Sequence, residues 1–336
     1  MSAVQTVKVS GDEADQRLDR WFKRRFPTLG HGKLEKLLRT GQVRVDGKRA
    51  KAAFRLEAGM EIRVPPLDDA LAPAKPAAPA AKPAPRVSKG ETEALRAAVL
   101  HKDEDVIVIN KPPGLAVQGG TGTSHHLDGM LDALKFDKVE RPRLVHRLDR
   151  DTSGALVLAR SAAAARWLAE AFKARTARKV YWALVVGVPK IRQGKIDMAL
   201  AKLPGPRGER MVEDEDAGKR AITLYTVIEN AAHRAAWLAM MPLTGRTHQL
   251  RAHAAALNTP ILGDGKYGGE KAFFRGPEGD GGRPKLHLHA REIAFARPDG
   301  KLLKVVAPLP AHMKATWDFF GFDANAKGDP FADADL

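Results

Sequence analysis

The chain has 336 residues, a length that usually exceeds a single hydrophobic core and therefore predicts two domains. Hydrophobic residues make up 44% of it, as expected for a globular protein. Lysine and arginine number 56 against 40 acidic residues, so the formal charge is +16, which favours nucleic acid or an anionic membrane surface as partner. The absence of cysteine excludes disulfides, thiolate metal sites and a cysteine nucleophile, and without an apolar signal core or membrane-length run we expect a cytoplasmic protein.

The first predicted domain, residues 1–69, has a core from 14 to 66 that combines two short helices with strands. Apolar side chains recur at i, i+3 and i+4, the spacing of a helix face that is buried. They are Leu18, Trp21 and Phe22 in the first helix and Leu34, Leu37 and Leu38 in the second. Asp46-Gly47 then interrupts an alternating segment, which predicts a two-residue hairpin, and "LEAGMEIRV" (56–64) predicts a further strand.

Basic residues dominate this domain. Between Arg17 and Arg55 there are thirteen basic and three acidic residues, a local charge of +10. A solvated face is the ordinary explanation for charge on one helix, but here the excess continues into the second helix and the hairpin. We therefore predict a surface that contacts phosphates. The predicted contact residues are Arg17, Arg20, Arg24, Lys33, Lys36, Arg39 and Arg44.

A change in composition separates this domain from the rest of the chain. Residues 70–85 read "ALAPAKPAAPAAKPAP", which cannot build a core and is typical of a semi-extended spacer. We assign residues 70–90 to this linker and residues 91–322 to the second domain. The acidic C-terminal segment, residues 323–336, is predicted to be disordered.

The second domain is predicted to be α+β. Strands are predicted at 105–110, 154–160, 179–188, 221–229, 234–243, 285–296 and 302–309, and helices at 161–175 and 247–258. Most consecutive strands are joined by short connections. This pattern favours a largely antiparallel mixed sheet with helices packed against it, rather than a doubly wound parallel sheet.

Four polar segments lie beside predicted strand ends. They are "INKPPGLAVQGG" (109–120), "HRLDRDTSG" (146–154), "RKVYWALVVG" (178–187) and "TGRTHQLRAH" (244–253). Together they resemble the RluA-type RNA pseudouridine synthases over about residues 95–310, and His146 before Arg147-Leu148-Asp149 is the distinguishing detail. The helix–helix–hairpin order of the first domain is similar to the S4 RNA-binding domain. "KPPGLAVQGGTGTS", "VHRLDRDTSG" and "GERMV" are most similar to the synthase C branch, which acts on 23S rRNA, with the D branch as the alternative.

The resemblance implies a pseudouridine synthase that isomerises specific uridines of 23S rRNA and binds no membrane. We expect it to be monomeric. Because the conversion adds and removes nothing, no cofactor or metal is expected. Asp149 matches the family's catalytic aspartate, which acts near the glycosidic bond. Asp151 is the competing carboxylate, and we expect it to hold the turn through Thr152-Ser153-Gly154 instead.

Three further residues are assigned by the same resemblance. Arg251 matches the arginine that pairs with the catalytic aspartate, although an exposed helix arginine is the alternative. Tyr181 matches the active-site tyrosine, whose ring stacks on the flipped uracil and whose hydroxyl is a candidate for proton transfer; ordinary core packing is the alternative. Arg147 resembles the residue that fills the space left by the flipped base.

Other patterns and functions compete with this interpretation. "GDGKYG" (263–268) fits a dinucleotide fingerprint but lacks a strand–turn–helix setting. Seven histidines of the second domain invite a metal site, yet none has helical H-E-x-x-H spacing, and His287 and His289 share a strand face. A non-catalytic RNA-binding protein would not need Asp149 with Arg251. A carboxylate hydrolase acting on a nucleoside or sugar would leave the S4-like domain unexplained.

Overall fold

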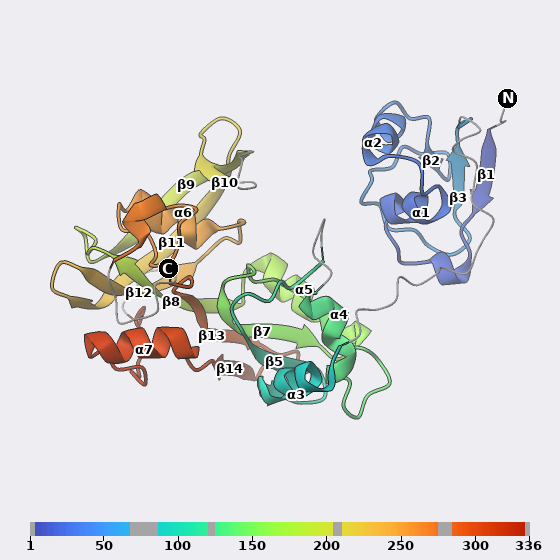
Figure 1. The fold of residues 1–336 in the computed structure, drawn as a ribbon. Coiled ribbons are helices and arrows are strands. Elements are labelled where there is room, and N and C mark those ends of the chain that lie inside the picture. Colours follow the sequence, from blue (N-terminus) through green and yellow to red (C-terminus); the bar gives the residue numbers. More distant parts are fainter. Residues whose placement is uncertain (1–3, 68–86, 120–124, 204–209, 275–283, 333–336) are drawn as a thin grey trace. The chain divides into compact units, whose positions relative to one another are not determined.

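The computed structural model describes residues 4–67, 87–119, 125–203, 210–274 and 284–332 (Figure 1). Two compact units account for the chain, residues 1–84 and residues 85–336. The proline-rich linker predicted at 70–90 lies outside the described residues up to 86, and a helix already begins at Lys89.

The N-terminal unit packs two helices on a small antiparallel sheet. The elements are β1 (Gln5–Lys8), a 3-10 turn (Gly11–Glu13), α1 (Leu18–Arg25), α2 (His31–Arg39), β2 (Arg44–Val45) and β3 (Glu61–Val64). The strand order is β1-β3-β2. All six apolar side chains predicted to face the core are buried, and Trp21 packs edge-on against Phe22 with ring centroids 5.1 Å apart.

The predicted hairpin at Asp46-Gly47 is only partly correct. The turn is present, with φ of 47° and 73° at its two residues, as a two-residue turn of this type requires. The segment after the turn contributes a single bridge, Val45 to Lys48, and no strand. β2 pairs with β3 instead, and the Asp46 carboxylate accepts a 2.8 Å hydrogen bond from the Glu61 N–H. The polar residues after the turn offer little apolar surface to hold a second arm.

The large unit is built on an eleven-stranded sheet. Its strands are β4 (Val99–Lys102), β5 (Val106–Lys111), β6 (Arg143–Leu144), β7 (Ser153–Ala159), β8 (Arg178–Val186), β9 (Gln193–Leu203), β10 (Arg210–Glu213), β11 (Lys219–Ala231), β12 (Ala235–Pro242), β13 (Leu288–Ala296) and β14 (Leu302–Val306). The main order is β10-β9-β11-β12-β8-β13-β7-β5-β4, with β14 on β13 and β6 on β7. Of these pairs, β13 with β7 is parallel and the others are antiparallel, so the predicted α+β class with a largely antiparallel mixed sheet is confirmed.

Helices cover the central strands. They are α3 (Lys89–Ala97), α4 (Leu127–Met130), α5 (Ala162–Ala174), α6 (Gln249–Ala256) and α7 (Ala311–Phe320), with 3-10 turns at Leu131–Leu134 and Gly269–Ala272. The predicted helices at 161–175 and 247–258 correspond to α5 and α6. All seven predicted strands are present, whereas α3, α4, α7, β4, β6, β9 and β10 were not predicted.

Side chains of the central strands alternate between two cores. In β8, Ala183 and Val185 pack with α6, whereas Trp182 and Leu184 pack with α7, which lies along this part of the sheet in Figure 1. Trp182, Trp237 and Trp317 form an aromatic cluster, with Trp237 edge-on to the other two rings at 4.5 and 5.4 Å. Packing on both faces of the sheet therefore holds β8 in place.

Gly154 explains how β7 can approach β13. Its φ is +111°, and a Cβ at this position would lie 2.3 Å from the Ala290 carbonyl oxygen. Only glycine allows the parallel pairing of Ser153 and Gly154 with His289 and Ala290. This close approach fixes the start of β7, directly after the charged "HRLDRDTSG" segment.

The prediction that the acidic tail is disordered is wrong for residues 323–332. Phe331 is 7% exposed and belongs to the aromatic core that contains Trp317. Asp329 pairs with Arg178 of β8. The buried Phe331 ring and the Arg178–Asp329 ion pair hold this segment against the large unit, although its polar composition suggested disorder. Residues 333–336 lie outside the described part.

Four histidines of the large unit are held neutral by the protein around them: His253, His287 and His289 are fully buried, and His146 is half-buried. Burial lowers the pKa of His146 and His287 to about 3 and that of His253 and His289 to about 4. His287 bonds Lys285 and Thr316, while His289 bonds Ser153 and Ala307, so both ring nitrogens of each are occupied by protein groups. The distances are 2.7, 2.9, 2.9 and 3.1 Å.

These histidines predict acid sensitivity. In the unfolded chain each takes up a proton near pH 6.5, whereas in the folded chain each stays neutral down to about pH 4. The free energy of unfolding should therefore fall as pH falls from 7 to 4, by up to about 1.4 kcal/mol per pH unit and histidine. Urea unfolding at several pH values measures this slope.

His253 offers the sharpest test of acid sensitivity, because neither of its ring nitrogens has a hydrogen-bond partner among the described residues. His253→Leu should remove its share of the slope and stabilise the protein more at pH 5 than at pH 7. Parallel stability curves for the two proteins would contradict this assignment.

Candidate active site

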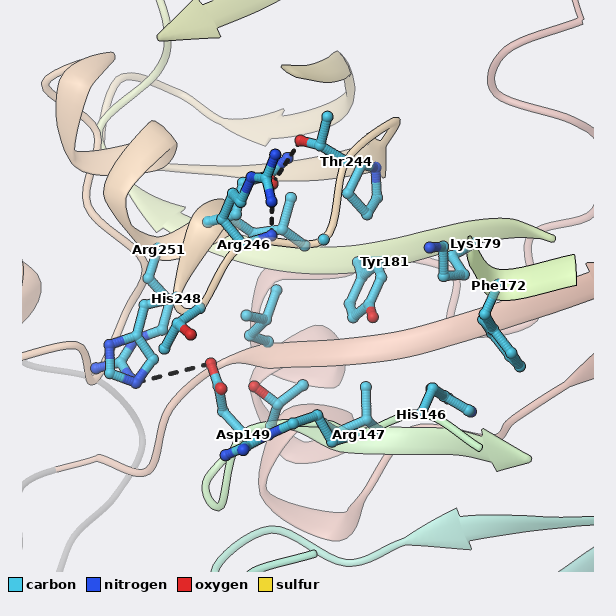
Figure 2. A pocket seen from close by; sticks show the side chains of 18 residues that line it. His146, Arg147, Asp149, Phe172, Lys179, Tyr181, Thr244, Arg246, His248 and Arg251 are labelled. Atoms are coloured by element: carbon cyan, nitrogen blue, oxygen red, sulfur yellow. Dashed lines mark hydrogen bonds and ion pairs between the residues drawn. The ribbon is translucent and has the colours of Figure 1, made fainter. Parts of the chain in front are cut away.

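Two neighbouring cavities in the large unit share Asp149, His248 and Arg251. The first, of about 300 Å³, is also lined by Arg147 and Tyr181. The second, of about 630 Å³, is lined in addition by the cations Arg150, Lys266 and Lys285. Figure 2 shows the first cavity: Arg147 and Asp149 face it from one side, Thr244, Arg246, His248 and Arg251 from the other, and Tyr181 lies between them. Asp149 thus lies at the boundary between two cavities, both of which are lined in part by cationic side chains.

The segment that carries Asp149 is anchored at both ends. At its start, His146 Nε2 accepts a 2.8 Å hydrogen bond from the Val157 N–H of β7, and its ring stacks on Phe172 at 4.3 Å. At its end, the Thr152 N–H donates to the Asp149 carbonyl at 3.2 Å, just before β7 begins. Because β7 lies inside the sheet, these bonds hold the Asp149 carboxylate on a rigid support.

Lys111 is a site residue that the sequence reasoning missed. Its side chain is fully buried at the end of β5, and its ammonium donates to the carbonyls of Pro112, Leu115 and Arg150 at 2.8–2.9 Å. Burial lowers the pKa of Lys111 to about 8, against the attraction of Asp151 and Asp149. The lysine joins the "KPPG" and "HRLDRDTSG" segments; its place in "INKPPG" directly after an apolar strand was the available signal.

Gln249 fixes the segment between β12 and α6. Its buried amide oxygen accepts from the Thr244 hydroxyl at 2.7 Å and from the Arg246 N–H at 3.0 Å. Its amide nitrogen donates to Ile222 and Thr223 of β11 at 2.9 Å. Both lone pairs of the oxygen and both hydrogens of the nitrogen are thereby used, so the loop "TGRTHQ" is held to the sheet.

The expected direct ion pair between Arg251 and Asp149 is wrong. Arg251 is buried and makes a bidentate pair with Asp264, through Nε at 2.8 Å and Nη2 at 2.7 Å. Asp264 is 1% exposed and belongs to "GDGKYG", where it also accepts from the Tyr267 N–H at 3.3 Å. A buried arginine needs a buried counter-ion, and the carboxylate of Asp264 meets that need.

Asp149 nevertheless lies in a positive field. Burial tends to lower the pKa of Arg251, but the carboxylates of Asp264 and Asp149 raise it overall. Asp149 likewise counteracts part of the lowering that burial causes in the pKa of Lys111. Among side chains, His248 faces the Asp149 carboxylate directly, with its Nε2 3.9 Å from Oδ2. Asp151 pairs with the exposed Arg150 at 3.2 Å, and within the described residues its carboxylate makes no hydrogen bond to the Thr152-Ser153-Gly154 turn that it was expected to hold.

Tyr181 and two cations complete the first cavity. Tyr181 extends from β8, and burial raises the pKa of its hydroxyl, helped by the Asp149 charge. Arg147 is exposed, and its guanidinium makes no hydrogen bond or ion pair within the described part of the chain. Lys179, which sequence reasoning missed, also lines the cavity; burial lowers its pKa, and Arg175 adds repulsion. The Tyr181 ring offers a surface on which a nucleotide base can stack, and the cations Arg147 and Lys179 are suited to contact the phosphates of that nucleotide.

Comparison with known proteins identifies the family. Residues 105–256 match the family model described as RNA pseudouridylate synthase. The mitochondrial RNA pseudouridine synthase 4 of Arabidopsis thaliana is 36% identical, covering 95% of this chain and 82% of its own length. Ribosomal large subunit pseudouridine synthase C of Escherichia coli (strain K12) is 34% identical, covering 93% of this chain and 95% of its own length. The chain belongs to the RNA pseudouridine synthase family.

A solved structure agrees with this membership. Human RNA Pseudouridylate Synthase Domain Containing 4 superposes with a TM-score of 0.55 at 29% identity, covering 68% of this chain and 95% of its own. The RluA-type resemblance is thereby confirmed, and the synthase is an isomerase acting on RNA. A purely RNA-binding protein and a carboxylate hydrolase, the two alternatives from sequence, are set aside.

The predicted RNA-binding residues of the N-terminal unit are all exposed. They are Arg17, Arg20, Arg24, Lys33, Lys36, Arg39 and Arg44. Arg17 occupies the N-cap position of α1 and pairs with Asp19 at 2.6 Å, while Arg44 donates to the carbonyls of Gly41 and Gly47. These seven side chains form an exposed basic surface on the N-terminal unit, and its role in RNA binding stays a prediction.

Where the structure describes the chain, no three histidine or acidic side chains converge as they would around a metal ion. No helix in the same part combines the length and apolar character needed to span a bilayer.

Proposed function

We propose that this synthase converts specific uridines of 23S rRNA to pseudouridine and that Asp149 is its catalytic carboxylate. The observation that carries the proposal is the place of Asp149 on the wall between the two cavities, with Tyr181 on one side and three cations on the other. A uridine flipped into the first cavity would have its base against Tyr181, and the basic second cavity suits a neighbouring phosphate.

The chemistry needs one carboxylate near the glycosidic bond. The C1′–N1 bond breaks, the uracil turns, and a C1′–C5 bond forms; the C5 proton is lost and N1 gains one, so the net change is zero. An ionised Asp149 would either attack or stabilise the positive charge that develops on the sugar. The buried cations Arg251 and Lys111 both interact electrostatically with Asp149. Tyr181 supplies the stacking surface, and Arg147 would occupy the space that the flipped base leaves.

The choice of 23S rRNA rests on similarity over nearly the whole chain. The relative named ribosomal large subunit pseudouridine synthase C covers 93% of this chain, so the likeness includes the N-terminal unit. That unit, with its exposed basic helices, is proposed to be an S4-like RNA-binding domain. Action in the cytoplasm and a monomeric state stay predictions, and one similar protein carries the description mitochondrial.

Pseudouridine mapping of 23S rRNA tests this function. Cells that lack the gene should lose pseudouridine at several positions, and the wild-type gene should restore it while Asp149→Asn should not. Loss confined to one helix-loop cluster would favour the D branch, and an unchanged rRNA would refute the substrate.

The basic N-terminal unit should supply affinity rather than chemistry. Because residues 1–84 and 85–336 form separate compact units, we expect a chain without residues 1–84 to stay folded. It should bind RNA more weakly, and the log–log salt slope should drop by roughly 0.7–0.9 for each phosphate that the shorter chain no longer neutralises. Salt titrations of binding, with single-turnover rates on saturating RNA, measure both effects.

Two outcomes would contradict this division of roles. Equal salt slopes for the two chains would mean that the basic surface does not contact RNA. A folded but inactive truncated chain would mean that the N-terminal unit helps to build the active site.

A further inference from the structure

His248 is held in an unusual conformation at the edge of both cavities. It is the N-cap of α6 and has φ of 51° and ψ of 21°, the left-handed region that residues with a Cβ rarely adopt. Gln249, the next residue, locks this loop to β11. Strained backbone that is fixed by its surroundings is common where a side chain must be aimed. Here the imidazole is aimed at Asp149, with Nε2 3.9 Å from Oδ2.

The other ring nitrogen has a buried partner that decides its protonation. His248 Nδ1 lies 3.0 Å from the Tyr267 hydroxyl, and the two rings meet edge-on at 5.6 Å. The same hydroxyl accepts a 2.9 Å hydrogen bond from the Met211 N–H of β10. Tyr267 is 7% exposed, so no large solvent shell competes for these contacts.

These contacts favour one tautomer. If the Tyr267 hydroxyl donates to Nδ1, the ring proton sits on Nε2 and points at the Asp149 carboxylate. In the reverse tautomer a nitrogen lone pair would face the carboxylate, and the hydroxyl proton would have no acceptor among the described residues. Burial lowers the pKa of His248 against the attraction of Asp149, so the neutral ring predominates at neutral pH.

We propose that His248 is a positioning residue for Asp149: its Nε2–H holds one carboxylate oxygen and leaves the other aimed at the bound uridine. The inference rests on the proposed catalytic role of Asp149. The 3.9 Å separation is long for a hydrogen bond, and it closes by a small shift of the carboxylate when substrate is bound. Tyr267 sets the tautomer, and the Met211 N–H holds Tyr267. A neutral donor fixes the carboxylate and leaves its negative charge in place. A direct pair with Arg251 would instead neutralise that charge.

Single-turnover rates of the full chain on saturating 23S rRNA fragments test the proposal. His248→Phe keeps the ring and removes the donor, so its rate constant should fall by about 10- to 100-fold, the effect of one charge-assisted hydrogen bond. RNA affinity should stay within about twofold, because the remote phosphate contacts are kept. His248→Gln places an amide N–H near the former Nε2, so its rate should return to within about fivefold of wild type.

Tyr267→Phe provides the second readout. It should slow the wild-type protein by about fivefold but have little effect in the His248→Gln background, because an amide has no tautomer to set. This comparison also stands if His248→Phe fails to fold. Thermal unfolding of each variant separates loss of fold from loss of rate.

Three results would overturn the positioning role: a wild-type rate for His248→Phe, a His248→Gln rate as low as that of His248→Phe, or an equal Tyr267→Phe effect in both backgrounds. Asp149→Asn serves as the reference. If that variant is active the proposed function itself fails, whereas an inactive Asp149→Asn with unaffected His248 variants removes only this inference.

Discussion

Asp149→Asn should reduce pseudouridine formation by at least about a thousandfold, as loss of a catalytic group does in other enzymes. The amide keeps the shape of the side chain but can neither attack the sugar nor stabilise positive charge on it. RNA affinity should be nearly unchanged, because binding depends on cations such as Arg147 and Lys179 that the substitution does not touch. Single-turnover conversion and filter binding on the same RNA fragment provide the two measurements.

Asp151→Asn is the matched control. This carboxylate is two residues away, pairs only with the exposed Arg150 within the described residues, and should be replaceable with little loss of rate. A residual rate near wild type for Asp149→Asn, or a larger loss for Asp151→Asn, would reverse the assignment. Activity lost to a chelator and restored by zinc would argue for metal chemistry instead.

Breaking the Arg251–Asp264 pair should have the largest effect on stability. Arg251→Ala or Asp264→Ala leaves a buried charge without its partner, which costs about 3–5 kcal/mol of unfolding free energy. Arg251→Ala should also slow catalysis, since the positive field at Asp149 weakens. Denaturant unfolding at neutral pH measures the stability change, and single-turnover rates measure the second effect.

The exposed Arg220–Asp197 pair is a matched control, because it is equally close at 2.6 Å but joins two surface strands. Arg220→Ala should change stability little, since water replaces the lost partner. The double variant Arg251→Met with Asp264→Leu should be more stable than either Arg251→Ala or Asp264→Ala, because both buried charges are then gone. Additive losses in the double variant would show that the pair is not a unit.

Much of the fold could be predicted because its core elements carry regular apolar patterns. β5 begins with an apolar run, β7 is almost entirely apolar, β8 is apolar after Arg178-Lys179, and α5 shows helical spacing. β9 was missed because only Ile196 and Leu200 of its eleven residues are buried, so charged side chains hide the strand pattern. α3 was also missed, although Ser88 and Glu91 form a capping box that is readable in the sequence.

The candidate site was predictable as a set of segments but not as a set of contacts. Motif resemblance brought together Asp149, Tyr181 and Arg251, and all three line the first cavity. It could not predict that Arg251 pairs with Asp264, because that pairing depends on how the "GDGKYG" turn folds back on α6. A local pattern also cannot reveal that Lys111 lies under three carbonyls from two separate segments.

The distribution of indole rings gives each unit its own optical signal. Of the five tryptophans, Trp21 is buried in the N-terminal unit, and the others belong to the large unit, where three are in mutual contact. Coupled indoles dominate near-ultraviolet circular dichroism, whereas the emission that Trp21→Phe removes reports only the N-terminal unit. Denaturation followed by both signals would therefore distinguish independent from concerted unfolding of the two units without any attached label.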